Sequence, residues 1–489
     1  MSVSPYPRAT RRRSFSPSAF AVLLGAAVGV LVQQARPGAV AVGVGALALL
    51  PLAAVVIAGT ARAATLTAAL TYAGALVWGY TVHFAPLYAY QGLIDAGPDP
   101  EATLVVVALA ALPAAWLPLS ALRPSTVVLW FVYLIGYVPA VIVPLWLTGD
   151  LEAVLPLDIA LLAAMAIVAL IVRLPPLPPL PVKVPHLSPT AFTRLLIVLG
   201  VMTSTYIAAT FGVNSVPSLG DVYETRDVFD TALGGAWAAG YIVPWAGNAI
   251  NPMLMALGIA RKRIDLLSLG LVGQLLIYAD TGFKSVLFSI ALVPLVYFVI
   301  SVARGSFGLV ATLGAPVLLV SGIIASPVTA EWSLSLVRRF FATPGQVGWY
   351  FYDFFSAHPR YELSHSFLSR LTSSPYVEDP PVLIGQVYFP ASQPSANAHL
   401  WADAFANFGF AGIVGFTVAL GVLLLIVDEL GQRRDARVIG PMLAIAGLSL
   451  ASSALFTTIL TLGLGLGCVL MALMPPGSGH AAPGADTER

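Results

Sequence analysis

Uninterrupted apolar stretches of about twenty residues recur along nearly all of this 489-residue chain, and an α-helix needs that length to cross a bilayer. Hydrophobic residues occupy 58% of the positions and charged residues only 10%, so the whole chain has the composition of a membrane protein. We expect an all-α, polytopic membrane protein with about fourteen transmembrane helices and one large extracytoplasmic loop. The helices are expected near residues 17–35, 38–59, 63–82, 102–122, 126–148, 155–173, 191–212, 232–258, 264–279, 285–303, 306–327, 404–428, 437–456 and 457–474.

The distribution of Lys and Arg predicts which loops face the cytoplasm. If the N-terminus, with Arg11, Arg12 and Arg13, is cytoplasmic, alternation of the spans puts 17 of the 24 Lys and Arg residues inside and 7 outside. This bias has the sign of the positive-inside rule, so both termini are expected in the cytoplasm. The net charge of +1 offers no bulk attraction to nucleic acid. The single cysteine, Cys468, excludes an intramolecular disulfide and a cysteine metal cluster.

Polar and proline-rich segments divide the chain into six parts. They are transmembrane helices 1–6 at 1–172, a cytoplasmic Pro-rich linker at 173–190, helices 7–11 with polar outward loops at 191–327, the large extracytoplasmic loop at 328–403, the C-terminal transmembrane helices at 404–474 and a cytoplasmic tail at 475–489. A loop as long as 328–403 is usually functional or disordered, and its many aromatic residues argue against disorder. Without a Walker loop, ATP-driven transport by this chain alone is not expected.

Seven basic residues fall on the outward side, against the topological bias: Arg36, Arg226, Lys284, Arg338, Arg339, Arg360 and Arg370. Guanidinium groups match phosphate oxygens in a bidentate way, so outward arginines beside aromatic rings suit anionic lipid headgroups. The stretch RRFFATPGQVGWYFYDFF, residues 338–355, combines both features, and its rings suit the membrane interface or sugar rings. Alternatively, each arginine pairs with a loop carboxylate such as Asp353 or Glu362 and binds no ligand.

Two further outward segments carry charge near the second group of spans. The loop NSVPSLGDVYETRDVF, residues 214–229, places Tyr223, Glu224 and Arg226 beside the large loop, where they either line the same cavity or are solvated. The next hairpin holds Asp280 and Lys284 after an arm of only about sixteen residues, so its tip is expected below the outer surface. An Asp280–Lys284 ion pair and a contact between Lys284 and phosphate are both compatible with this depth.

The chain re-enters the membrane with ANAHLWADAFANFGFAGIVGF. On a helix, His399, Asp403 and Asn407 are spaced i, i+4 and i+8 and share one face at the outer end of the span beginning near 404. This spacing brings together a carboxylate, a proton carrier and an amide, which makes Asp403 the main catalytic candidate. Alternatively, His399 caps the helix and Asn407 bonds a neighbouring helix.

Five segments, taken in order, resemble bacterial O-antigen polymerases, the Wzy-type oligosaccharide repeat-unit polymerases: SLGDVYETRDVF, NPMLMALGIARKR, DTGFKSVLF, RRFFATPGQVGWYFYDFF and NAHLWADAFANFGFAGIVG. The similarity covers roughly residues 190–430. It implies a multi-pass protein of the bacterial cytoplasmic membrane that joins glycan repeat units carried on undecaprenyl diphosphate, at the outer face, in surface polysaccharide biosynthesis. The implied partners are a polyprenyl diphosphate-linked donor and acceptor, membrane lipids, and a flippase or chain-length regulator, with no cofactor.

The implied chemistry is glycosyl transfer from a lipid diphosphate. Such a donor already has a good leaving group, so catalysis requires stabilisation of its charge, positioning of the acceptor hydroxyl and removal of one proton. No convincing Asp-x-Asp pair occurs in the second half, so we expect a metal-independent, inverting reaction. The expected catalytic residues are Asp403 with His399 as base or orienting pair, and Arg338 with Arg339 on the diphosphate. The expected substrate-binding residues are Arg226, Tyr223, Glu224, Lys284, Arg360, Arg370 and Asn407.

Three other functions use some of the same features. An O-antigen ligase takes the same donor and transfers a finished glycan to a different acceptor. A polyprenyl-dependent C-type glycosyltransferase would place its acidic site in the first outward loops, where Asp95, Asp99 and Glu101 form no convincing metal-binding arrangement. A lipid-linked oligosaccharide flippase would also have about fourteen helices, but it has little use for the large outward segment at 328–403.

Overall fold

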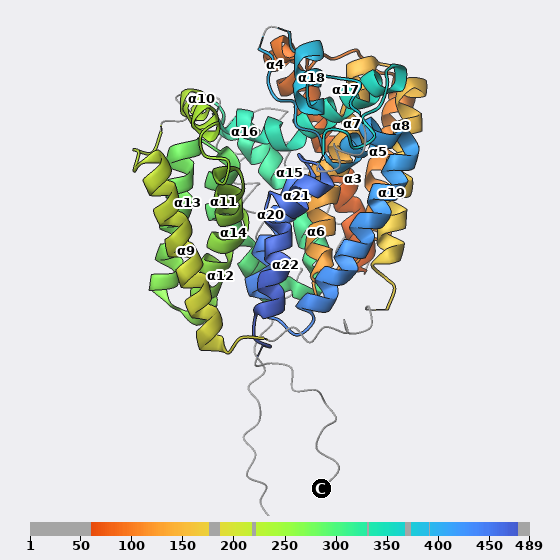
Figure 1. The fold of residues 1–489 in the computed structure, drawn as a ribbon. Coiled ribbons are helices and arrows are strands. Elements are labelled where there is room, and N and C mark those ends of the chain that lie inside the picture. Colours follow the sequence, from red (N-terminus) through yellow and green to blue (C-terminus); the bar gives the residue numbers. More distant parts are fainter. Residues whose placement is uncertain are drawn as a thin grey trace, which may run out of the picture.

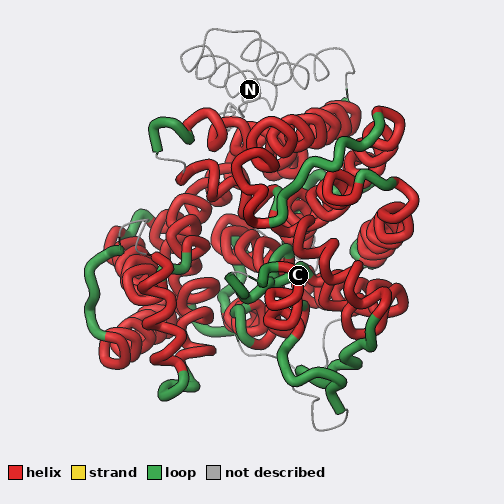
Figure 2. Tube along the Cα trace, turned by 90° about the horizontal axis from the view of Figure 1, so that it is seen from above, coloured by secondary structure: helices red, strands yellow, loops and turns green. Residues whose placement is uncertain are grey.

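The computed structural model describes residues 60–175, 186–217, 222–329, 332–366, 373–390 and 392–477, and every regular element within them is a helix (Figure 2). The all-α prediction is therefore confirmed for this part of the chain. The expected helices near 17–35 and 38–59, Arg36, Arg370, and most of the predicted linker and tail lie outside the described residues.

The α-helices begin and end as follows (Figure 1): α3 Ala61–Gly79, α4 Ala85–Tyr88, α5 Pro100–Ala111, α6 Ser125–Phe131, α7 Val138–Thr148, α8 Leu151–Ile171, α9 Pro189–Phe211, α10 Val222–Leu233, α11 Ala239–Trp245, α12 Asn251–Arg261, α13 Ile264–Thr281, α14 Lys284–Ala303, α15 Phe307–Ala325, α16 Trp332–Phe341, α17 Thr343–Ala357, α18 Pro380–Tyr388, α19 Leu400–Gly431, α20 Ala436–Leu450, α21 Leu455–Leu460 and α22 Leu464–Leu473. Short π-helical turns continue α6 into α7 and α11 into α12, so each pair acts as one rod.

Seven helical segments of the described residues are long and apolar enough to cross a membrane. They are Ser125–Thr148, Leu151–Ile171, Pro189–Phe211, Ala239–Arg261, Ile264–Thr281, Lys284–Ala325 and Leu400–Gly431. The segment Lys284–Ala325 contains both α14 and α15, which a 3₁₀ turn joins. The spans expected near 102–122 and 437–474 are shorter, broken helices. The chain is thus a membrane protein with several spans, and the total of fourteen stays a prediction.

The rod formed by α6 and α7 is deeply buried in the bundle, whereas α9 stands at its edge (Figure 1). Within the most apolar part of each segment, 89% of the α6–α7 rod is buried inside the protein but only 28% of α9. α7 packs on α5, α8 and α17, whereas α9 packs on α13 and on the rod formed by α11 and α12. Most of the apolar surface of α9 is therefore left uncovered by the described residues, as expected of a helix that faces lipid.

Polar side chains bond the rod formed by α11 and α12 to its neighbours at a break in the helix. Pro244 lies in α11, and the π-helical turn Ala246–Ile250 follows it. Nε2 of Gln274 donates to the carbonyl oxygen of Gly247 at 2.8 Å, and Nδ2 of Asn248 donates to that of Leu462 at 3.1 Å. One carbonyl of the irregular backbone, that of Gly247, is thus bonded to the neighbouring helix α13, as a low-dielectric environment requires.

The segment expected as a large outward loop is itself helical in its described parts. α16, α17 and α18 lie with α4 toward one end of the bundle, and we call these three helices the helical cap (Figure 1). α17 packs directly on α7, because a Cβ at Gly345 would lie 2.1 Å from the carbonyl oxygen of Pro139. Nε2 of Gln346 also donates to the carbonyl oxygen of Gln91 at 2.7 Å. The helical cap is therefore held against the bundle, and its side chains have defined positions that those of a free loop would lack.

Candidate functional site

The beginning of α19 carries the three residues that the sequence places on one helix face. His399 is the N-cap, outside the helix, and its Nδ1 accepts a hydrogen bond from the backbone N–H of Ala402 at 3.3 Å. Asp403 and Asn407 follow within the helix, one turn apart. Nδ2 of Asn407 donates to the backbone carbonyl of Asp403 at 2.8 Å and lies 3.4 Å from carboxylate Oδ1. Asp403 and Asn407 therefore form a contact pair, while His399 shapes the helix start.

A loop that follows α17 folds over this pair. Nε2 of His365 lies 3.5 Å from Oδ1 of Asp403, and Oδ1 of Asn407 accepts a hydrogen bond from the backbone N–H of Leu363 at 2.8 Å. Glu362 and Leu363 adopt φ values of 50° and 65°, which non-glycine residues rarely take. The hydrogen bond from the backbone N–H of Leu363 to Asn407 on α19 holds the loop in this strained turn. The histidine that contacts the Asp403 carboxyl group in the structure is thus His365 and not His399.

Arg360 lies where α19 is broken. The helix is interrupted at Phe408 and Gly409, and Gly409 has φ 62° and ψ −144°, a conformation open essentially to glycine alone. A Cβ on Gly409 would lie 2.7 Å from Cζ of Arg360, so the guanidinium rests directly on the break. Cζ of Arg360 is also 5.4 Å from the ring centroid of Phe405, a cation–π distance. The sequence NFGFAG therefore seats a cation within about one helical turn of Asn407. We call His365, Asp403, Asn407 and Arg360 the α19 cluster.

His399 has a structural environment that differs from that of the α19 cluster. Its ring is 2% exposed and lies against α17, since a Cβ at Gly348 would be 2.4 Å from Nε2. Burial lowers the pKa of His399 to about 4, because the charged imidazolium would lose its hydration. A neutral ring that accepts at Nδ1 carries its proton on Nε2. His399 is therefore a neutral cap at physiological pH.

The two adjacent arginines of α16 point to different surroundings. Cζ of Arg338 lies 4.4 Å from the ring centroid of Tyr88, at the end of α4, and Arg338 is partly buried. Arg339 is exposed. Near Tyr88, the ring of Tyr90 is 78% exposed, so an aromatic face is open to solvent beside this cation. Arg338 therefore lies against an aromatic surface.

Arg226 and Lys284 form a separate basic group across the bundle. Cζ of Arg226, on α10, lies 5.0 Å from the ring centroid of Phe283, and Lys284 is the next residue along the chain. In the same hairpin, the carboxylate of Asp280 accepts a hydrogen bond from Nδ2 of Asn214 at 2.9 Å. α10 and the helical cap lie at the same end of the bundle (Figure 1). Arg338 on the helical cap and the pair Arg226 and Lys284 therefore lie at the same end of the bundle, which is also the end where the α19 cluster lies.

Three predicted site residues are not placed by the structure. Arg370 lies outside the described residues, as do the side chains of Tyr223 and Glu224, whose backbone belongs to α10. Within the described residues, no group of three or more His, Cys, Asp or Glu side chains is arranged to hold a metal ion. The described residues at this end of the bundle offer the guanidinium groups of Arg226, Arg338 and Arg360 and the ammonium group of Lys284 to stabilise negative charge.

Two ionisable side chains near α19, His365 and Asp158, were not predicted from the sequence. His365 has no periodic relation to Asp403, and the only signal for it is its place in RYELSHSF, shortly after Arg360. Asp158 is fully buried in α8, a helix that packs on α19. A single acid inside a membrane span is itself a signal of function or of a buried partner.

The α19 cluster combines the groups that proton transfer beside an anion requires. Asp403 is 7% exposed, Nε2 of His365 lies 3.5 Å from one of its oxygens, and Arg360, from the loop after α17, places a positive charge against the break in α19. A carboxylate held in this way is able to accept a proton from a hydroxyl group, and a guanidinium is able to bind a phosphate or a sugar hydroxyl. No protein-family model, curated protein or solved structure gives a significant match to this chain.

Proposed function

We propose that the chain is a glycosyltransferase that joins oligosaccharide repeat units, carried on a polyprenyl diphosphate, into a surface polysaccharide at the outer face of the bacterial cytoplasmic membrane. The observation that carries the proposal is the α19 cluster, in which Asp403 contacts His365 while Arg360 rests on the helix break beyond Asn407. The support from sequence is the resemblance to Wzy-type polymerases, in which the segment NAHLWADAFANFGFAGIVG contains Asp403 and Asn407.

In the proposed mechanism, the α19 cluster binds the acceptor. The acceptor hydroxyl lies against Asp403, and Arg360 binds the acceptor glycan or its lipid phosphate. His365 keeps the carboxylate oriented, because its Nε2 lies 3.5 Å from Oδ1. Asn407 is bonded to both Asp403 and the backbone of Leu363, so it holds the loop and the helix in one geometry. Such positioning is worth a large part of a glycosyl-transfer barrier.

The donor half of the mechanism uses the other basic residues of the same face. The acceptor oxygen attacks the anomeric carbon, the bond from that carbon to the diphosphate oxygen breaks, and the hydroxyl proton passes to the carboxylate of Asp403. Direct displacement inverts the anomeric configuration. The departing diphosphate gains negative charge, which Arg338, Arg226 and Lys284 stabilise by charge-assisted hydrogen bonds. The exposed ring of Tyr90 beside Tyr88 supplies an aromatic face for a sugar ring.

Chain growth on a purified lipid-linked repeat unit tests the proposal. The protein in liposomes, given only undecaprenyl diphosphate-linked repeat units, should produce a ladder of glycans that differ by one repeat unit, with release of undecaprenyl diphosphate. A transporter would move the lipid between leaflets without lengthening the glycan. A ligase would leave the repeat unit single until a different acceptor was added. Either result would contradict polymerase activity.

A further inference from the structure

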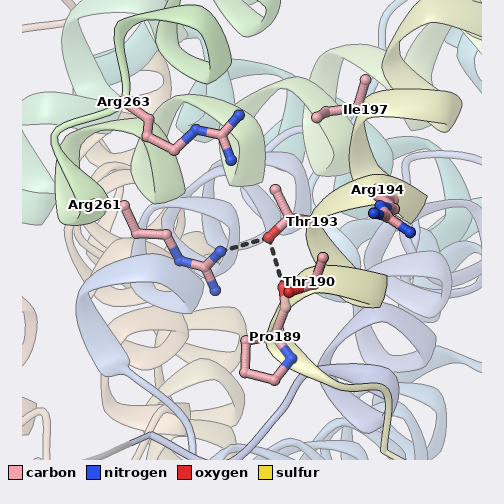
Figure 3. A pocket seen from close by; sticks show the side chains of 7 residues that line it. All are labelled: Pro189, Thr190, Thr193, Arg194, Ile197, Arg261 and Arg263. Atoms are coloured by element: carbon pink, nitrogen blue, oxygen red, sulfur yellow. Dashed lines mark hydrogen bonds between the residues drawn. The ribbon is translucent and has the colours of Figure 1, made fainter.

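The opposite end of the bundle carries a cavity of about 350 Å³ between α9 and the α12–α13 turn. Its lining residues are Pro189, Thr190, Thr193, Arg194, Ile197, Arg261 and Arg263, and none of them is acidic. Arg261 and Arg263 extend from one wall and Arg194 lies on the other (Figure 3). The volume is at the lower end of the range of small-molecule sites. A space of this size with three guanidinium groups is suited to a compact anion with several oxygens.

Contacts within the cavity hold two of the guanidinium groups in place. Nη1 of Arg261 donates to the hydroxyl oxygen of Thr193, and that hydroxyl donates to the backbone carbonyl of Pro189 at 2.7 Å (Figure 3). Arg263 forms a two-point ion pair with Asp265, which compensates one of the three charges. Arg194 is exposed at the mouth. Two positive charges of the lining are therefore left for a ligand, and Arg261 is already oriented for it.

The position of the cavity indicates what kind of anion reaches it. α9, α12 and α13 all belong to apolar spans that begin or end here, so the cavity lies at the level of lipid headgroups. α9 begins at Pro189 with Ser188 as its N-cap, so the positive end of its dipole also points into this region. Ile197 lines the cavity one turn deeper along α9 than Arg194. The lining thus changes from cationic to apolar in the direction of the membrane, as an amphiphile with a phosphate head requires.

We propose that this cavity, lined by Arg194, Arg261 and Arg263 beside the N-terminus of α9, binds a phosphate group, at the end of the bundle opposite to the α19 cluster. An anionic phospholipid headgroup and a free phosphate share this chemistry. The site is separate from the proposed glycosyl-transfer site and does not depend on it. Lys262 lies in the same turn and carries the same charge but does not line the cavity, so it provides a matched control.

Binding is measured as the change in thermal midpoint of the detergent-purified protein on titration with phosphatidylglycerol, phosphatidylcholine or inorganic phosphate. We expect saturable stabilisation by phosphatidylglycerol that phosphatidylcholine does not reproduce. R194Q should weaken the apparent affinity about tenfold, because one charge-assisted contact to phosphate is lost, whereas K262Q should change it less than twofold. R261Q should weaken it at least as much, since Arg261 is oriented by Thr193.

The comparison of probes also identifies the source of the phosphate. Saturable stabilisation by inorganic phosphate that R194Q weakens, with no additional effect of the lipid, would support the site with free phosphate as its ligand. Equal stabilisation by phosphatidylcholine, no saturable effect of any probe, or an equal loss in K262Q and R194Q would overturn the proposal. R194Q leaves no buried partner behind, because Arg194 is exposed, so a folded variant is expected for the test.

Discussion

Gly409→Ala is the substitution for which the structure makes the sharpest stability prediction. Gly409 sits at φ 62° and ψ −144°, and holding a non-glycine residue in such a region costs about 1–3 kcal/mol. The new Cβ would in addition lie 2.7 Å from Cζ of Arg360, so the guanidinium has to leave the helix break. We therefore expect Gly409→Ala to destabilise the protein and to displace a residue of the α19 cluster.

Gly415→Ala is the matched control, because it lies in the same helix with no atom within 4 Å of the added Cβ and with helical backbone. Alanine is favoured over glycine in a helix by about 0.5–1 kcal/mol, so this variant should be as stable as the parent or more stable. The two variants should then differ by about 1.5–4 kcal/mol in the free energy of unfolding.

This difference is measured by unfolding the two variants in mixed detergent micelles. Sodium dodecyl sulfate is titrated in, and the loss of helix is followed by ellipticity. In the double variant Gly409→Ala/Arg360→Ala, only the part of the stability loss that comes from the contact with Arg360 should be recovered. The part that comes from the strained backbone remains. Equal stability of Gly409→Ala and Gly415→Ala would contradict the predicted backbone strain. Chain growth by Gly409→Ala at the parental rate would contradict the proposed role of Arg360, since Arg360 would then have moved without consequence.

Three further predictions concern His399, Arg338 and the orientation of the chain. Burial lowers the pKa of His399 from 6.5 to about 4, so between these two pH values the unfolded state binds a proton that the folded state does not. The free energy of unfolding should therefore be at its full value above pH 6.5 and should decrease by about 3 kcal/mol as the pH falls to about 4. His399→Asn, which keeps a capping acceptor, should remove that part of the pH dependence, and thermal midpoints at pH 7 and pH 5 that fall equally in both proteins would contradict it. Arg338→Ala should reduce chain growth by about a hundredfold and Arg338→Lys by less, because lysine keeps the charge near Tyr88 but loses the planar fork, and equal loss in both would argue against a charge contact. Cysteines introduced at Ser374 and Ser188 should differ in labelling by an impermeant thiol reagent on intact cells, with Ser374 accessible, and equal labelling would overturn the topology.

Apolar length was sufficient to predict most of the described spans, because a helix in lipid has to satisfy its own backbone. The spans expected near 191–212 and 264–279 appear as Pro189–Phe211 and Ile264–Thr281. Caps explain the small differences at their ends: α9 starts two residues early, at a Ser188 N-cap followed by Pro189. α5 is shorter than expected because a 3₁₀ turn containing Pro113 ends it.

Tertiary contacts explain what the sequence did not show. The segment after residue 328 contains helices because α17 has α7 to pack on, and the close approach at Gly345 is visible only when both helices are in place. The contact between His365 and Asp403 depends on a loop with two left-handed non-glycine residues, Glu362 and Leu363, which no propensity favours. In the same way, nothing in the pattern of the chain relates Arg261 to Thr193. Helix spacing, by contrast, did place Asp403 and Asn407 together.

The role of Asp403 as the proton acceptor is the central claim about the reaction. Asp403→Asn keeps the shape of the side chain and its contact with Asn407 but removes the acceptor of the proton. Glu429→Gln makes the same chemical change near the far end of the same helix, so it reports the effect of losing a carboxylate from α19 away from the cluster.

Single-turnover chain growth with lipid-linked repeat units, measured alongside donor binding and thermal midpoint, tests this role most directly. We predict that Asp403→Asn lowers the rate by at least a hundredfold, with donor affinity and thermal midpoint close to those of the parent, while Glu429→Gln grows chains normally. A folded Asp403→Asn protein that forms polymer at the parental rate would contradict the account, as would a loss of activity that only follows a loss of folded protein.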